Sequence, residues 1–200
     1  MKIQSTQQVI QRYSKTDISK NDKEFKEEIG AFVIAFSELE FGIAFLCAMT
    51  EFDLRKKDEY IHKYLGFTFE RKLQHLTSFI SENLNELEPI WSKIKVEIGQ
   101  INRERRFLVH GFMKYHLPIE TITTHIKEKS NITTKKQSIE EIRELVNRLD
   151  NLKTGENGIN GSFLILFTKT RIDKWNDLVS NDNKIVYKVN NEILSNWKGK

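Results

Sequence analysis

The stretch IGAFVIAFSELEFGIAFLCAM, residues 29–49, decides the fold class because it is apolar along nearly its whole length. It is as long as a membrane-spanning helix. Glu38 and Glu40 stand at its middle, however, where an ionised carboxylate would be costly in hydrocarbon. A buried helix therefore explains the stretch better than a membrane span. Because this helix is apolar on most sides, the rest of the fold must cover it, and a partner subunit offers further cover.

The apolar pattern extends the predicted helix to residues 22–51. Asn21 and Glu24 stand three positions apart, as in a capping box at a helix start. Apolar residues then recur at spacings of three and four, namely Phe25, Ile29, Phe32, Phe36, Leu39, Ile43 and Leu46. We expect residues 1–21 to form an N-terminal extension.

The same periodicity predicts three further helices before residue 112. A short one ends at Gly66, which breaks the pattern. A second lies within residues 68–84. A third begins near Pro89, a residue suited to a first helical turn, and continues to Gly111.

A small β-hairpin followed by one more helix is predicted after Pro118. Residues 119–137 hold two β-branched, threonine-rich segments joined at Ser130 and Asn131. Ser138 and Glu141 then form a second capping-box pattern, which starts a helix with an apolar inner face.

The C-terminal part is less determined by its pattern. Glycines and asparagines predict a loop at residues 154–162. FLILFT, residues 163–168, fits either a buried strand or a helix, and KIVYKV, residues 184–189, looks extended. The predicted fold is therefore mainly α, a helical bundle over residues 22–153 with a small hairpin. An α or α+β extension at residues 161–200 is expected to pack on it.

Composition limits compartment and partners. A formal charge of +4 arises from 32 basic and 28 acidic residues, so nucleic acid is permitted as a partner while much of the charge is solvated surface. The single cysteine, Cys47, forms no internal disulfide and is expected to pack as a small hydrophobe. The first residues contain no apolar segment of signal-peptide length. We therefore expect a cytoplasmic protein.

Common cofactor motifs do not occur. The sequence contains no phosphate-binding loop, no pair of cysteines or histidines at zinc spacing and no nucleophile elbow. His110 and His116 lie close together in sequence but without a carboxylate motif, so a metal site is not favoured. We expect His75 at the surface or at its boundary rather than as a ligand.

The segment RERRFLVHGF, residues 103–112, combines several guanidinium groups with one imidazole. Arg106 and His110 are four positions apart and are neighbours on a helix. A helix end alone accounts for much of this pattern, because its unpaired carbonyls favour cations and a left-handed glycine such as Gly111 often ends a helix.

The order of elements adds a second interpretation. Arg105, four intervening residues, His110 and Gly111 close a long helix that follows a buried helix containing FSELE at 36–40. This arrangement resembles the HEPN superfamily of small all-helical domains, whose signature is an arginine, four to six residues and a histidine. The hairpin before SIEEIRELVNRL is similar to that of bacterial members. The resemblance covers about residues 22–153.

The resemblance implies a metal-independent endoribonuclease without a cofactor. In such enzymes a ribose 2′-hydroxyl attacks the adjacent phosphate and leaves a 2′,3′-cyclic phosphate. His110 would act as acid or base, and Arg105 would hold the charged phosphorane. HEPN domains form two-fold dimers that bring two signature helices to one cleft, so the resemblance implies a homodimer with a composite active site.

The resemblance leaves the supporting roles open. Asn102 would hydrogen-bond the phosphate or cap a neighbouring group, and Glu40 would orient Arg105 or lie at a wet boundary. Arg106 departs from the family pattern, in which Asn, Asp or His commonly follows the arginine. Arg103 also satisfies the looser spacing, but Arg105 is the predicted essential residue.

RNA would be held along the same segment. Arg103, Arg106 and Lys114 would contact phosphates without reading sequence. Phe112 and Tyr115 would stack on unpaired bases, although packing in the core is the better expectation for both aromatic residues.

Three functions follow from these patterns. The first is a HEPN-type ribonuclease, serving as a toxin or phage-defence effector with an antitoxin or regulatory protein as a partner. The second is a non-catalytic HEPN-like module that binds RNA, nucleotide or protein. The third is a helical interaction protein in which the motif is a helix end alone.

Overall fold

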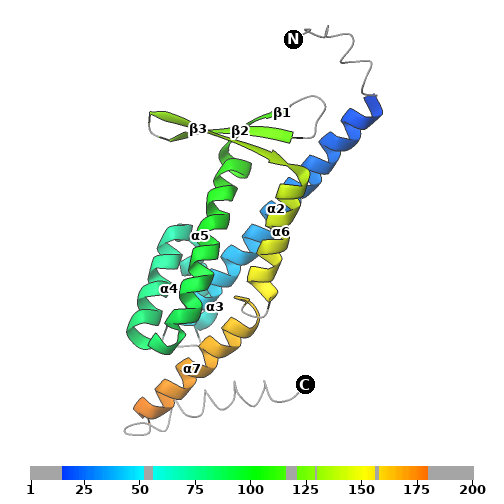
Figure 1. Ribbon diagram of the computed structural model, residues 1–200. Coiled ribbons are helices and arrows are strands. Elements are labelled where there is room, and N and C mark those ends of the chain that lie inside the picture. Colours follow the sequence, from blue (N-terminus) through cyan, green and yellow to red (C-terminus); the bar gives the residue numbers. More distant parts are fainter. Residues whose placement is uncertain (1–14, 52–55, 116–120, 129, 156–157, 180–200) are drawn as a thin grey trace. The chain divides into compact units, whose positions relative to one another are not determined.

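The chain is mainly helical and has one small antiparallel sheet (Figure 1). The computed structural model describes residues 15–51, 56–115, 121–128, 130–155 and 158–179. These contain helices α2 (Lys15–Ala48), α3 (Lys57–Leu65), α4 (Phe69–Asn83), α5 (Glu88–His110), α6 (Ile139–Thr154) and α7 (Ser162–Val179), the short 3-10 helix η2 (Asn85–Leu87), and strands β1 (Phe112–Tyr115), β2 (Thr121–Glu128) and β3 (Asn131–Ser138). The mainly α class is thus confirmed.

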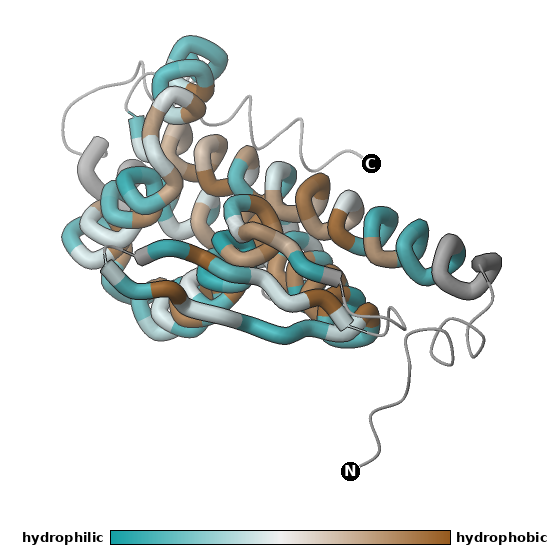
Figure 2. The backbone as a smooth tube through the Cα atoms, turned by 90° about the horizontal axis from the view of Figure 1, so that it is seen from above, coloured by the Kyte–Doolittle hydropathy of each residue, from teal (hydrophilic) through white to brown (hydrophobic). Residues whose placement is uncertain are grey.

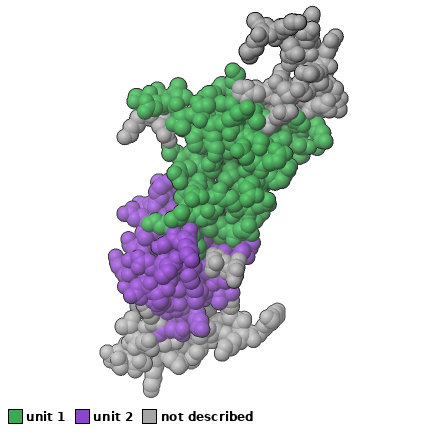
Figure 3. Space-filling model, in the orientation of Figure 1, with its two compact units in different colours: residues 1–41, 94–153 green, residues 42–93, 154–200 purple. Residues whose placement is uncertain are grey.

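The chain divides into two compact units, which Figure 3 distinguishes by colour. Unit 1 comprises residues 1–41 and 94–153, and unit 2 comprises residues 42–93 and 154–200. The boundary after residue 41 falls inside α2, and the boundary before residue 94 falls inside α5. Each of these two helices therefore contributes residues to both units.

Unit 1 joins parts of α2 and α5 to α6 and the sheet. Arg143 of α6 donates to Glu28 of α2 over 2.8 Å, and Arg148 of α6 donates to Glu97 of α5 over 2.7 Å. Apolar side chains between these helices form its core, including Phe25, Phe32, Phe36, Leu39, Ile98, Ile101, Ile142, Leu145 and Leu149. The ion pairs lie beside an apolar core, whose burial supplies most of the driving force for packing.

The sheet has the strand order β1-β2-β3, and all its pairs are antiparallel. Ile122, Thr124 and Ile126 of the central strand are buried, so their face of the sheet lies against the helices. On that face Glu104 of α5 accepts hydrogen bonds from Lys135 and Gln137 of β3. The C-terminal part of α5 is therefore attached to the sheet.

Aromatic packing around α7 characterises unit 2. The Phe163 ring stacks on Trp91 at a centroid distance of 5.7 Å, and the Phe167 ring lies 6.1 Å from Phe79 of α4. Residues 163–168, which fit strand or helix by sequence, are helical. Residues 184–189, for which extended structure was predicted, lie outside the described residues.

The predicted start of α2 is wrong, because the helix continues through Asn21 and already includes Lys15. Instead of capping, the polar residues of this segment form ion pairs between positions four apart, such as Lys20 with Glu24 and Lys23 with Glu27. Such pairs stabilise a continuous exposed helix. The two polar residues whose spacing resembles a capping box, Asn21 and Glu24, therefore lie within the helix.

Burial of the apolar stretch in α2 is confirmed on one side. Phe25, Phe32, Leu39 and Ile43 have no exposed surface. Among the described helices, α2 has the length and composition to cross a membrane, and 56% of its most apolar window is buried. Figure 2 shows that strongly hydrophobic and hydrophilic residues alternate along this helix.

Most remaining element predictions agree with the structure. The helices α4, α5 and α6 occupy the predicted segments, and α3 ends before Gly66. Ser138 and Glu141 form the predicted capping box, with reciprocal hydrogen bonds of 2.7 and 3.1 Å. The predicted hairpin corresponds to β2 and β3. The third strand, β1, was not predicted because four residues are too few for a periodic pattern.

Candidate functional site

Arg105 lies half-buried on α5, on the side of the helix that contacts α2. Its Nε donates a hydrogen bond of 3.1 Å to Asn102 Oδ1, one turn earlier. Its guanidinium carbon lies 4.8 Å from the centre of the Phe36 ring of α2, a distance at which cation–π attraction is favourable. Two contacts thus hold the guanidinium from one side.

The outer end of the Arg105 guanidinium has no hydrogen-bond acceptor among the described residues. A guanidinium has five N–H groups arranged as a fork, and only the Nε–H is bonded by a described residue. Its two terminal amino groups carry four N–H groups, and no described residue accepts a hydrogen bond from them. An anion with two oxygens, such as a carboxylate or phosphate, fits this end of the fork.

His110 is the last residue of α5 and is exposed. Among the described residues none forms a hydrogen bond or ion pair with its imidazole, so both ring nitrogens can meet a ligand or another chain. A backbone hydrogen bond follows directly after it, in which Gly111 N donates to Phe107 O over 3.1 Å before β1 begins.

Gly111 is required for lack of space rather than for a left-handed backbone. The expectation of a left-handed glycine is wrong, because its φ is outside the positive range. A Cβ added to Gly111 would lie 1.9 Å from Thr124 Cγ2 and 2.4 Å from Phe107 O. The close approach of β2 to the end of α5 therefore requires a glycine directly after His110.

The other predicted site residues occupy different environments. Arg103, Arg106 and Lys114 are exposed. Glu40 is half-buried on α2, but the described hydrogen-bond partner of Arg105 is Asn102 rather than Glu40. Tyr115 pairs with Ile122 in the sheet, and its side chain lies outside the described part.

The described residues were also expected to hold no metal site, since no ligand motif occurs in the sequence. No group of three or more His, Cys, Asp or Glu side chains within the described ranges is placed to hold a metal ion. His116, the second histidine near the motif, lies outside these ranges.

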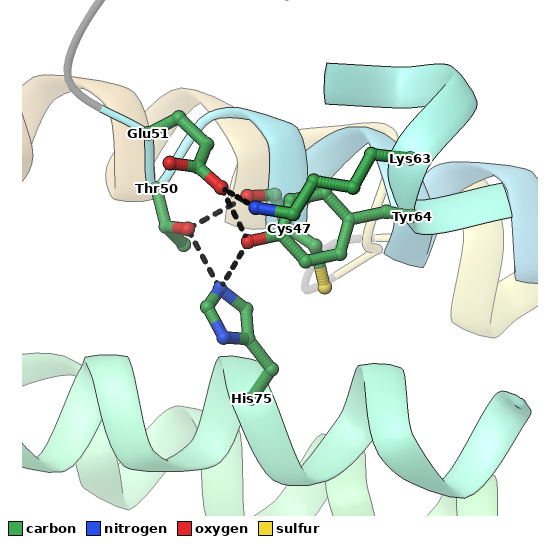
Figure 4. Close-up of polar contacts among 6 residues, drawn as sticks. All are labelled: Cys47, Thr50, Glu51, Lys63, Tyr64 and His75. Atoms are coloured by element: carbon green, nitrogen blue, oxygen red, sulfur yellow. Dashed lines mark hydrogen bonds and ion pairs between the residues drawn. The ribbon is translucent and has the colours of Figure 1, made fainter. Parts of the chain in front are cut away.

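A second polar cluster, centred on His75 in unit 2, was not predicted (Figure 4). His75 Nε2 lies 2.8 Å from the Thr50 hydroxyl and 3.0 Å from the Tyr64 hydroxyl. Tyr64 donates to Glu51 Oε1 over 2.7 Å, and Lys63 donates to the same oxygen over 2.7 Å. These contacts connect α3 and α4 to the residues that follow α2.

The hydroxyl hydrogens determine the tautomer of His75. Thr50 donates its hydrogen to Cys47 O over 2.7 Å, and Tyr64 donates its hydrogen to Glu51. Both hydroxyl oxygens are therefore left to accept, so Nε2 is the protonated nitrogen and its single N–H is shared between them. His75 Nδ1 is then the acceptor nitrogen, and no described residue donates to it (Figure 4).

Burial and charge act in opposite directions within this cluster. Burial lowers the pKa of His75 more than the nearby Glu51 carboxylate raises it. Burial alone would raise the pKa of Glu51, but hydrogen bonds from Lys63 and Tyr64 outweigh it and lower that pKa. The structure therefore favours neutral His75 beside ionised Glu51.

Cys47 lies next to this cluster and is buried, as predicted. Its thiol donates to Lys72 O at 3.4 Å, and burial raises its pKa to about 12. A thiol with this pKa is not a nucleophile near neutral pH. The expectation that Cys47 packs as a small hydrophobe is confirmed.

Sequence periodicity contained a partial signal for the His75 cluster. His75 stands directly before Leu76, a fully buried residue of α4, and thus at the edge of the buried stripe. Thr50, Glu51 and Tyr64 belong to other segments, and nothing in their local sequence relates them to His75.

Comparisons of the chain with protein-family models, with curated proteins and with solved structures find no match. The geometry around Arg105 and His110 is therefore the ground for a functional proposal.

Proposed function

We propose that the protein is a metal-independent endoribonuclease of the HEPN type, with Arg105 and His110 as catalytic residues. The observation that supports this most directly is the half-buried Arg105 guanidinium, which Asn102 and Phe36 hold while its outer N–H groups lack a described acceptor. The side chain is thus ordered in advance for an anion. An exposed imidazole follows five residues later on the same helix.

The reaction that suits these groups is attack of a ribose 2′-hydroxyl on the neighbouring phosphorus. An imidazole of His110 takes the hydroxyl proton as the bond from the 2′-oxygen to phosphorus forms. The bond from phosphorus to the 5′-oxygen then breaks, and the leaving oxygen receives a proton. The products are a 2′,3′-cyclic phosphate and a 5′-hydroxyl, and Arg105 stabilises the extra negative charge on the phosphorane between them.

Two proton transfers require two acid–base groups, whereas one chain supplies one His110. A second copy of the chain would supply the other imidazole, with His110 of the partner subunit protonating the leaving oxygen. Apolar side chains on the outer face of α2 support this arrangement, since Val33, Ile34 and Phe41 are 39%, 63% and 49% exposed. Such a surface is suited to an isologous contact between two copies.

Cleavage of mixed-sequence RNA in the presence of a chelator tests the proposal. We expect the wild-type protein to release fragments that end in 2′,3′-cyclic phosphate. His110→Ala should lower the rate by about 10²-fold or more because general acid–base catalysis is lost. Arg105→Lys keeps the charge but removes the fork, and it should lower the rate by about 10²-fold.

Two matched variants control for side-chain loss. His62→Ala removes another exposed histidine from the last turn of a helix. Arg71→Lys removes another guanidinium stacked on a phenylalanine, here Phe67 at 3.8 Å. Both should cleave as wild type does. Equal cleavage by wild type, His110→Ala and Arg105→Lys would refute the assignment, and RNA binding without any cleavage would favour the non-catalytic module.

A further inference from the structure

The face of the sheet that points away from the helices is defined by strand register. Side chains alternate between the two faces of a strand, and Ile122, Thr124 and Ile126 of β2 occupy the buried face. The opposite face, here called the outward face, consists of Phe112, Lys114, Thr121, Thr123, His125, Lys127, Ile132, Thr134, Lys136 and Ser138. Thr123, at its centre, is buried, and the other nine are exposed or half-buried. Figure 2 looks down on the sheet and shows its strands as mostly hydrophilic, with isolated hydrophobic residues.

An aromatic row crosses the middle of the outward face. Phe112 of β1 stands opposite His125 of β2, and His125 stands opposite Thr134 of β3. The expectation that Phe112 packs in the core is wrong, because its side chain is 79% exposed, which is a large apolar surface in contact with water. His125 Nδ1 and Thr134 Oγ1 lie 2.9 Å apart, so the imidazole is held in place. Phe112 and His125 are thus directly opposed on adjacent strands, which places their Cβ atoms about 5 Å apart.

A basic row lies beside the aromatic row. Lys114 and Lys136 stand on either side of Thr123, and Lys127 lies at the far end of β2. All three lysines are exposed, and no described residue forms an ion pair with them. None of the ten outward positions is acidic. On the opposite face, by contrast, Glu104 neutralises Lys135.

We propose that the outward face binds single-stranded RNA, with unpaired bases stacked on Phe112 and His125 and phosphates held by Lys114 and Lys136. Aromatic rings flanked by cations suit this ligand because every base has a face to stack, whereas a duplex exposes mainly phosphates. A protein partner would need contiguous apolar surface, but lysines and threonines separate Phe112 from Ile132.

The inference rests on the proposed function, because that function makes the bound RNA strand the substrate. Phe112 follows His110 by two residues, across the tight junction at Gly111. An RNA strand bound on the outward face would therefore pass close to the imidazole of His110. The ligand class is RNA without sequence preference, because stacking and phosphate contacts do not read base edges.

Binding can be measured apart from cleavage in the full chain with His110→Ala. We would titrate it into a fluorescein-labelled single-stranded 12-mer RNA of mixed sequence and follow fluorescence anisotropy. Adding Phe112→Leu keeps an apolar side chain but removes the ring, and it should weaken binding roughly tenfold. Phe112→Trp should restore it.

Charge contributions are tested with paired lysine variants. Lys114→Gln with Lys136→Gln should reduce the slope of log Kd against log salt by about 1.4, since each phosphate contact contributes about 0.7 for single strands. Lys95→Gln with Lys169→Gln is the matched control, because both are exposed and lie on helices. This control should keep the slope of the parent.

Several results would overturn the inference. Unchanged affinity in Phe112→Leu would do so, as would equal losses in the two lysine pairs or equal affinity for an acidic peptide of similar length. The two proposals fail separately. If wild type cleaves RNA while the outward-face variants bind and cleave normally, the outward face is not the binding surface. If wild type never cleaves but Phe112→Leu loses binding, the ribonuclease assignment fails and the binding surface remains.

Discussion

Arg103 and Arg105 are separated by one residue on α5, and their different surroundings distinguish them. Arg105 contacts Asn102 and the Phe36 ring, so its guanidinium loses little further conformational entropy when an anion binds. Arg103 is exposed, and among the described residues none holds it. An ordered guanidinium is suited to transition-state stabilisation, whereas an exposed one is suited to loose contact with phosphate.

Gly99 lies within α5 and Gly111 directly follows its last residue, but the two glycines differ in the space around them. A Cβ at Gly111 would overlap Thr124 and Phe107, while a Cβ at Gly99 would meet no atom within 4 Å. Gly111→Ala should therefore lower the free energy of unfolding by about 1–3 kcal/mol through overpacking. Gly99→Ala should raise it by about 0.5–1 kcal/mol, because alanine favours helix.

Urea unfolding followed by circular dichroism measures both glycine variants against wild type. A Gly111→Ala protein as stable as wild type would show that the junction between α5 and β1 has room for a methyl group. A destabilised Gly99→Ala protein would indicate that the exposed face of α5 is covered in solution.

At the scale of elements, the sheet determines the setting of the signature helix. Glu104 attaches α5 to β3 through Lys135 and Gln137, and β1 continues directly from the helix end. The last turn of α5 is therefore fixed at two places. His110 lies between them, which limits the directions in which its imidazole can point.

The His75 cluster also connects separate elements, and we expect its hydrogen bonds to depend on the protonation of His75. Neutral His75 shares its single Nε2–H between the hydroxyl oxygens of Thr50 and Tyr64. Protonation would add a charge and an N–H at Nδ1, for which the described residues supply no acceptor. Lys63 would also repel the added charge, although Glu51 would attract it.

Stability should consequently fall below neutral pH. The pKa of His75 is lowered in the folded state, so the unfolded chain binds a proton more readily. Its contribution is complete above the unfolded pKa of 6.5 and is lost as pH falls through the lower folded value. Wild type should be less stable in urea at pH 5.5 than at pH 7.5, and His75→Gln should reduce that difference.

His62→Gln is the matched control for His75, because His62 is exposed in the last turn of α3. It should keep the pH dependence of wild type. The Glu51 carboxylate has a lowered pKa, so its contribution is lost only below the unfolded value of 4.5 and does not enter the comparison between pH 5.5 and 7.5. A wild-type protein that is equally stable at both values would contradict the cluster's proposed sensitivity.

At the scale of the whole molecule, the exposed side of α2 predicts self-association. Val33, Ile34 and Phe41 lie on one side of the helix, within a stripe that Gly30 and Ser37 continue. We expect wild type to sediment as a dimer at micromolar concentration. Ile34→Glu with Phe41→Glu should give a folded monomer that no longer cleaves RNA, because charges on both sides of a two-fold seam repel.

Ile165→Glu is the control for the dimer variant, since Ile165 is 49% exposed on α7, which belongs to unit 2. It should sediment and cleave as wild type does. Circular dichroism establishes that each variant is folded. Monomeric wild type at micromolar concentration would count against a composite active site, whatever its activity.

Local sequence determined much of the fold. The helices α4, α5 and α6, the capping box of Ser138 and Glu141, and the hairpin of β2 and β3 all follow from patterns within a few residues. Interactions over three or four positions recur wherever a helix forms, so periodicity records them. The pair Arg105 and His110 was found for the same reason, because both belong to one helix.

Tertiary packing decided what local patterns left open. It selected Asn102 as the described hydrogen-bond partner of Arg105, gave Gly111 a steric role, added β1 to the hairpin, and joined Thr50, Glu51 and Tyr64 around His75. Such contacts depend on side chains brought together by the burial of apolar surface from distant segments. Sequence alone therefore determined where α4, α5 and α6 lie and that Arg105 and His110 share a helix, and only the folded chain decided which groups hold the Arg105 guanidinium.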